Sequence, residues 1–142
     1  MKAGEPPVPA PDYGRSLRGL GFNLLVRNIP RAVKFAEDVL GATAFFANDQ
    51  FAALKLNGAD FMFHHDNTYW NNELSGIIKG TEARGIGVEL RIYGCDPDTA
   101  EQRARAGGWT VLAGSLDKPH GLRECMIIDD EGYVWVPSFH LP

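Results

Sequence analysis

The stretch Gly-Leu-Gly-Phe-Asn-Leu at residues 19–24 recurs as Gly-Ile-Gly-Val-Glu-Leu at residues 85–90. The same offset carries Gly41, at the end of one helical stretch, onto Gly107, at the end of another. An offset that persists over this length is typical of a duplicated supersecondary unit. The chain of 142 residues is therefore predicted to contain two copies of one structural module.

The first copy begins with a predicted strand at residues 22–27, followed by a helix that opens at Asn28 or Ile29. Pro30 falls in the first turn of that helix, where its missing N–H is not needed. Short apolar segments separated by turn residues follow, and this pattern is typical of strands. The predicted strands cover residues 44–46, 51–56 and 60–64.

The second copy repeats this order, beginning with a predicted strand at residues 88–93. Asp96 is a good N-cap for the following helix, Pro97 suits its first position, and Gly107 suits its end. Three further strands complete the copy at residues 110–112, 123–128 and 134–139.

Each copy thus has the order βαβββ, which predicts an α+β fold. A four-stranded sheet with one helix leaves one sheet face open, so two modules bury more surface by forming a curved mixed sheet around a cavity. The predicted divisions are an extended, proline-rich arm at residues 1–18, the modules at residues 19–65 and 85–142, and a linker or lid at residues 66–84.

Composition excludes several classes of protein. Hydrophobic residues make up 44% of the chain, as in globular proteins, and the 14 basic residues are scattered in a chain of net charge −4, which disfavours nucleic acid as a partner. No apolar run is long enough for a membrane span or a signal peptide, so we expect no membrane contact and a cytoplasmic protein. Cys95 and Cys125 lack the spacing of a metal or disulfide motif and are expected to be reduced thiols.

Three motifs resemble one protein family. Val-Arg-Asn at residues 26–28, with Phe35 and Val-Leu-Gly at residues 39–41, resembles the V-x-D…F-Y…V-L-G opening of the vicinal-oxygen-chelate superfamily. Asp-Asp-Glu-Gly-Tyr at residues 129–133 resembles its closing D-P-D-G-Y turn, and residues 117–124 resemble the D-R-P-W-G-x-R-E loop of bleomycin-resistance-type members. The resemblance implies paired βαβββ modules and a glyoxalase, dioxygenase or antibiotic-binding function.

The resemblance also implies where metal-using relatives hold their ion, on the first and last strands of each module. The matching positions here are Gly21, Met62, Gly87 and Val136. None of these residues suits a hard divalent cation. We therefore expect no cofactor, with a divalent metal at a non-standard position as the alternative.

Strand alternation indicates which side chains share a face with those positions and form the cavity wall. The candidate wall residues are Asn23, Leu25, Asp60, Met62, His64, Glu89, Arg91, Val136 and Ser138. His64 is interpreted first as a hydrogen-bonded strand-end histidine and second as a ligand or proton-transfer group. Glu89 is either held by Arg91 in an ion pair or meets a ligand, and it is the candidate catalytic base.

Two loop pairs extend the candidate site. Tyr69 and Trp70 lie in the linker, where they either cover the cavity mouth or anchor the connection to the core. His120 and Arg123 either border the pocket entrance or only stabilise a turn.

The leading hypothesis is a metal-free protein of bleomycin-resistance type that sequesters a hydrophobic or cationic small molecule. The alternative is a glyoxalase- or dioxygenase-like enzyme that recruits Asp60, His64 or Glu89 around an ion, or a metal-independent isomerase with Glu89 as base. Relatives commonly pair, so we expect a homodimer. The sequence leaves open whether both halves of a cavity come from one chain.

Overall fold

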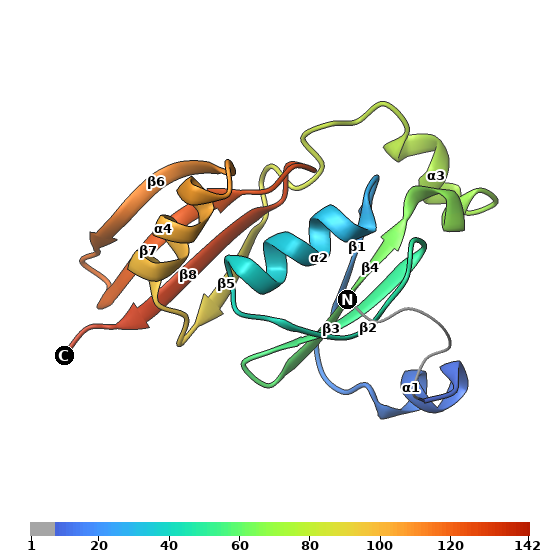
Figure 1. Ribbon diagram of the computed structural model, residues 1–142, viewed down its shortest axis with the longest axis horizontal. Helices are drawn as coiled ribbons and strands as arrows, with labels where there is room; N and C mark the ends of the chain where they lie inside the picture. Colours follow the sequence, from blue (N-terminus) through green and yellow to red (C-terminus); the bar gives the residue numbers. More distant parts are fainter. Residues whose placement is uncertain (1–7) are drawn as a thin grey trace.

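The computed structural model describes residues 8–142 and shows two modules side by side (Figure 1). In the first module, strand β1 (Phe22–Val26) leads to helix α2 (Ile29–Asp38), whose N-cap Asn28 accepts a hydrogen bond from the Arg31 N–H at 2.9 Å. Strands β2 (Thr43–Ala47), β3 (Phe51–Leu56) and β4 (Ala59–His65) follow. The sheet has the order β1-β4-β3-β2, with β1 and β4 parallel.

The second module repeats this arrangement. It contains β5 (Glu89–Tyr93), α4 (Pro97–Ala106), β6 (Thr110–Asp117), β7 (Leu122–Ile128) and β8 (Val134–His140), with the order β5-β8-β7-β6. The 3₁₀ helix η1 (Asp66–Tyr69) and helix α3 (Glu73–Ile78) connect the modules. The predicted α+β fold of two βαβββ modules is confirmed, and the described strands form two separate sheets rather than a closed barrel.

The prediction of an extended N-terminal arm is wrong for residues 10–16. These residues form helix α1 (Ala10–Ser16), in which Pro11 occupies the first turn and loses no hydrogen bond there. Tyr13 of α1 packs on Phe45 and Phe51, with ring centroids 5.7 and 6.5 Å apart, so α1 lies against the first sheet. Residues 1–7 of the expected arm lie outside the described residues.

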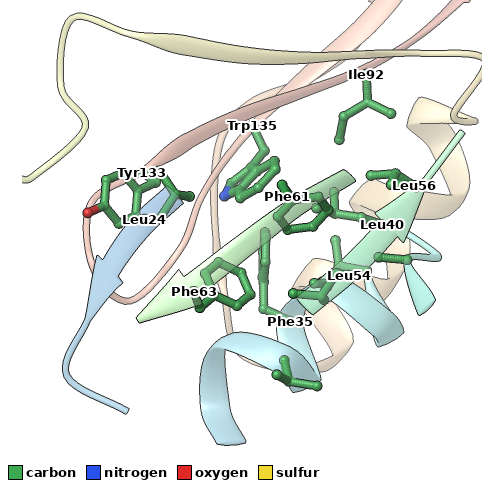
Figure 2. Close-up of a cluster of buried hydrophobic side chains, with 14 of the residues drawn as sticks. Leu24, Phe35, Leu40, Leu54, Leu56, Phe61, Phe63, Ile92, Tyr133 and Trp135 are labelled. Carbon is green, nitrogen blue, oxygen red and sulfur yellow. The ribbon is translucent and has the colours of Figure 1, made fainter. Parts of the chain in front are cut away.

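The two modules share one hydrophobic core on the helix-covered sides of their sheets. Figure 2 shows Trp135 of β8 beside Phe61 of β4, with Phe35 of α2 close by. The Trp135 ring centroid lies 5.8 Å from that of Phe61 and 6.0 Å from those of Phe35 and Phe22. The modules therefore join through their helix-covered faces, which leaves the opposite face of each sheet free to form a site.

A buried ionic contact also ties the linker to both modules. Arg84, only 3% exposed, donates from Nη1 and Nη2 to the two Asp66 carboxylate oxygens, each at 2.7 Å. Its Nη1 also donates to the Leu25 carbonyl of β1 at 3.0 Å and lies 3.7 Å from a carboxylate oxygen of Glu131, in the turn before β8. The hydrogen bond and charge of Asp66 raise the pKa of Arg84, which stays charged despite its burial.

Both cysteines are buried and unpaired, as expected for reduced thiols. No helix within residues 8–142 is long and apolar enough to cross a membrane.

Candidate functional site

An apolar cavity of about 370 Å³ lies between α1 and the open face of the first sheet. Its lining residues are Val8, Ala10, Tyr13, Gly14, Leu17, Phe45, Phe46, Phe51, Ala53, Met62 and His64. Of these side chains, only Tyr13 and His64 carry nitrogen or oxygen atoms. The volume is within the usual range of small-molecule sites, roughly 300–1,000 Å³.

Strand alternation and one irregularity shape this cavity. Met62 and His64 alternate on β4, so both side chains face away from the core, where Phe61 and Phe63 are buried. The register between β2 and β3 shifts between Ala44 and Phe46. A bulge of this kind redirects side chains, which explains how Phe45 and Phe46, although adjacent, both reach the cavity.

His64 is held by a chain of polar side chains from β1 and η1. Its Nδ1 lies 2.6 Å from Oδ1 of Asn23, and Nδ2 of Asn23 donates to the Tyr69 hydroxyl at 2.8 Å. The His64 ring centroid also lies 4.8 Å from that of Phe51 and 5.6 Å from that of Tyr69. The histidine is therefore fixed in one orientation at the cavity wall.

Burial lowers the pKa of His64 below its ordinary value of 6.5. The folded protein then binds this proton more weakly than the unfolded chain, so the contribution of His64 to stability is lost as the pH falls below that value. We expect the free energy of unfolding to fall more steeply between about pH 7 and about pH 5 in the wild type than in a His64→Phe variant. Urea unfolding at each pH measures this difference, and an equal slope in both proteins would contradict it.

The other first-module candidates take different places. Asn23 supports His64, whereas Leu25 is buried and its carbonyl accepts hydrogen bonds from Arg84 and Tyr133. Asp60 pairs with Lys55 at 2.6 Å and is absent from the residues that line the cavity.

Of the two interpretations that the sequence left open for the linker aromatics, the structure supports an anchor for Tyr69 and neither interpretation for Trp70. Tyr69 anchors the connection through Asn23 and His64. Trp70 is 78% exposed and does not line the cavity.

Three second-module candidates meet on the open face of the second sheet instead of sharing the cavity. Arg91 pairs with Glu89 at 3.3 Å and with the buried Glu124, which His120 approaches to 3.2 Å. Glu89 is exposed, so it does not lie inside a closed cavity. The ion pair with Arg91 is the interpretation that the geometry supports.

The remaining second-module candidates have structural contacts. Val136 and Ser138 are buried, and Ser138 donates to the Ile92 carbonyl at 3.3 Å. Arg123 faces α4 and binds Asp98 and Asp117, each at 2.9 Å. The described residues that line this cavity all belong to the first module and to the segment before it, and within the chain the modules join through their other faces. A cavity with wall residues from both modules, of one chain or of two, stays a prediction.

Sequence reasoning missed the aromatic half of the wall, Tyr13, Phe45, Phe46 and Phe51. Phe51 alternates with Ala53 on β3, and that period could have placed it. Tyr13 depends on a helix that the proline-rich composition argued against, and Phe45 depends on the bulge.

Solved structures with a similar architecture are known. A glyoxalase-related enzyme from Fulvimarina pelagi matches with a TM-score of 0.68 and 17% identity, over 87% of this chain and 89% of that chain. This chain has the glyoxalase/bleomycin-resistance fold. A glyoxalase/bleomycin resistance protein/dioxygenase family enzyme from Burkholderia phytofirmans PsJN matches with a TM-score of 0.67 and 19% identity, over 85% of this chain and 97% of that chain. A glyoxalase/bleomycin resistance protein/dioxygenase from Nocardioides matches with a TM-score of 0.63 and 20% identity, over 92% of this chain and 90% of that chain. No protein-family model and no curated protein sequence matches this chain.

The glyoxalase/bleomycin-resistance fold can hold a metal ion, and the side chains here do not fit one. Gly21, Met62, Gly87 and Val136 bring no carboxylate or imidazole to the positions that the family resemblance indicates. Within residues 8–142, no three His, Cys, Asp or Glu side chains lie together in a group that could hold an ion.

Proposed function

We propose that this protein binds a flat, uncharged, mostly apolar small molecule in the cavity beneath α1, without a metal ion. The observation that carries the proposal is the cavity wall, in which the described residues combine several aromatic side chains with only two polar ones. Aromatic faces suit flat ligands. Of the hydrophobic and cationic ligands considered from the sequence, the lining favours the former, because no described lining residue is acidic and a buried unpaired cation is costly.

Filling the cavity tests the proposal. Ala53 is buried on β3 in the cavity wall, so Ala53→Phe places a ring in the space that a ligand needs. We expect at least about tenfold weaker binding of naphthalene, about 1.4 kcal/mol, in a titration followed by naphthalene fluorescence.

The matched control is Ala113→Phe, the same change at an exposed position on β6 of the other module. It should leave naphthalene binding unchanged. Equal affinity in the wild type and Ala53→Phe would mean that naphthalene binds elsewhere, and it would contradict the proposal. Absence of binding by the wild type would contradict it as well.

The rival is a metal-dependent enzyme of glyoxalase or dioxygenase type. The separation of Glu89 from Asp60 and His64, in different modules, argues against the ligand sets considered from the sequence. Metal analysis of protein purified without chelator distinguishes the two. About one equivalent of zinc, nickel, manganese or iron per chain would support the rival.

Sequestration of bleomycin-resistance type and homodimer formation stay predictions. The names of the similar structures include enzymes and resistance proteins alike, so the shared fold does not choose between these roles. Titration with cationic glycopeptides tests the first, and the molar mass in solution tests the second.

A further inference from the structure

We infer that the ligand of the cavity is a phenol, an aromatic compound whose hydroxyl donates a hydrogen bond to Nε2 of His64. The inference rests on the proposed function, because it requires that the cavity bind a small molecule. It adds the chemical group that the site recognises and the residue that recognises it.

The first step is the tautomer of His64. Asn23 uses Nδ2 to donate to Tyr69, which turns its Oδ1 toward Nδ1 of His64 at 2.6 Å. An amide oxygen only accepts hydrogen bonds, so Nδ1 carries the proton. In a neutral ring Nε2 is then left with a free lone pair, and the lowered pKa of His64 favours the neutral ring.

The second step is that Nε2 lacks a partner. Among residues 8–142, the hydrogen bonds of His64 side-chain nitrogens involve only Nδ1. Nε2 is not one of the buried unpartnered side-chain atoms of the described residues, so it is accessible, and the rest of the wall beside His64 is apolar or aromatic. A ligand that donates a hydrogen bond to Nε2 therefore replaces water there at the one ring nitrogen that is free to accept.

The third step selects the donor. Phe45, Phe46 and Phe51 supply aromatic faces for a flat ring. A phenol brings a donor on such a ring and carries no net charge, whereas an ammonium group would be buried without a carboxylate from any described residue of the wall. The Tyr13 hydroxyl, also part of the wall, is itself buried without a hydrogen-bond partner in the described chain. This hydroxyl gives a ligand with a second polar group another possible hydrogen-bond partner in the wall.

Two probes that differ by one hydroxyl test the inference. Naphthalene and 2-naphthol are titrated at about pH 8, well above the ordinary histidine pKa, so that His64 is neutral. The measured quantity is the ratio of the naphthalene Kd to the 2-naphthol Kd. We expect this ratio to be about 5–10-fold higher in the wild type than in His64→Phe, which keeps a flat side chain and removes the acceptor.

Variants of Asn23 test whether the tautomer matters. Asn23→Leu removes the hydrogen bond that fixes the His64 tautomer and should lower the ratio. Asn23→Asp still accepts a hydrogen bond from the Nδ1–H group and should keep the ratio close to that of the wild type. Nitrogen-15 NMR gives an independent signature. The Nε2 resonance should be that of an unprotonated nitrogen, and it should move when 2-naphthol binds but stay in place with naphthalene.

The outcomes separate the two proposals. If both probes bind and the ratio is equal in the wild type and His64→Phe, or if Nε2 carries the proton, the inference fails and the proposed function stands. If neither probe binds the wild type, the proposed function fails and the inference falls with it. Retained naphthalene binding in His64→Phe shows that this variant is folded.

Discussion

Replacing Trp135 with alanine is expected to lower the free energy of unfolding by about 3–5 kcal/mol. The side chain is fully buried where the two modules meet, against Phe35 and Phe61 (Figure 2). It also packs on Phe22. Its removal leaves a cavity that surrounding rings fill only in part. It also removes the indole N–H that donates to Asp129 at 2.9 Å. Denaturant unfolding followed by circular dichroism measures the loss.

Two matched variants show which part of the loss belongs to packing. Trp70→Ala makes the same substitution at a solvent-exposed site and should change stability by less than about 0.5 kcal/mol. Trp135→Phe keeps most of the ring contacts and loses the hydrogen bond to Asp129. Its free energy of unfolding should therefore lie between those of the wild type and Trp135→Ala. A loss below about 1 kcal/mol in Trp135→Ala would mean that the modules do not share a core.

Replacing Arg84 with methionine is expected to cost about 3 kcal/mol, the lower end for breaking a buried ion pair. The change leaves the Asp66 carboxylate without the Arg84 donors, removes one of the two donors to the Leu25 carbonyl, and removes a positive charge close to Glu131. The loss stays near the lower end because Glu131 keeps its 2.9 Å ion pair with Arg27. The measurement is the midpoint and slope of urea unfolding.

Arg123→Met is the matched control for this variant. Arg123 also holds two carboxylates, Asp98 and Asp117, but the side chains of all three residues are at least one-third exposed. Exposed pairs contribute about 0–1 kcal/mol, so the control should lose far less than Arg84→Met. Similar losses in the two variants would show that burial does not set the value of the Arg84 contacts.

The order of the elements along the chain and the phase of the strands could be predicted from the sequence, because both follow from local patterns. The phase that placed Met62 and His64 on one face, away from Phe61 and Phe63, is the phase of β4. The duplicated stretch then predicts a second module of the same topology. Local patterns of this kind act within a few residues and require no knowledge of the rest of the chain.

The choice of which faces meet could not be predicted in the same way. An open sheet face and a helix-covered face both present alternating apolar residues. Tertiary packing, such as that of Trp135 against Phe35 and Phe61, decides that the helix-covered faces join. This choice separates Glu89 and Arg91 from His64. The cavity also depends on α1, whose contacts through Tyr13 are tertiary and override the composition of the segment.

Helix α1 forms one wall of the cavity and has only seven residues, none of them buried. A helix this short does not persist in water by itself, so it remains helical through its contacts with the sheet and with whatever lies beneath it. Coupling between two binding events is reciprocal. The affinity for a guest molecule and the docking of α1 on the sheet are therefore coupled, and a guest that favours the docked helix is bound more tightly by the same free energy with which it stabilises that helix.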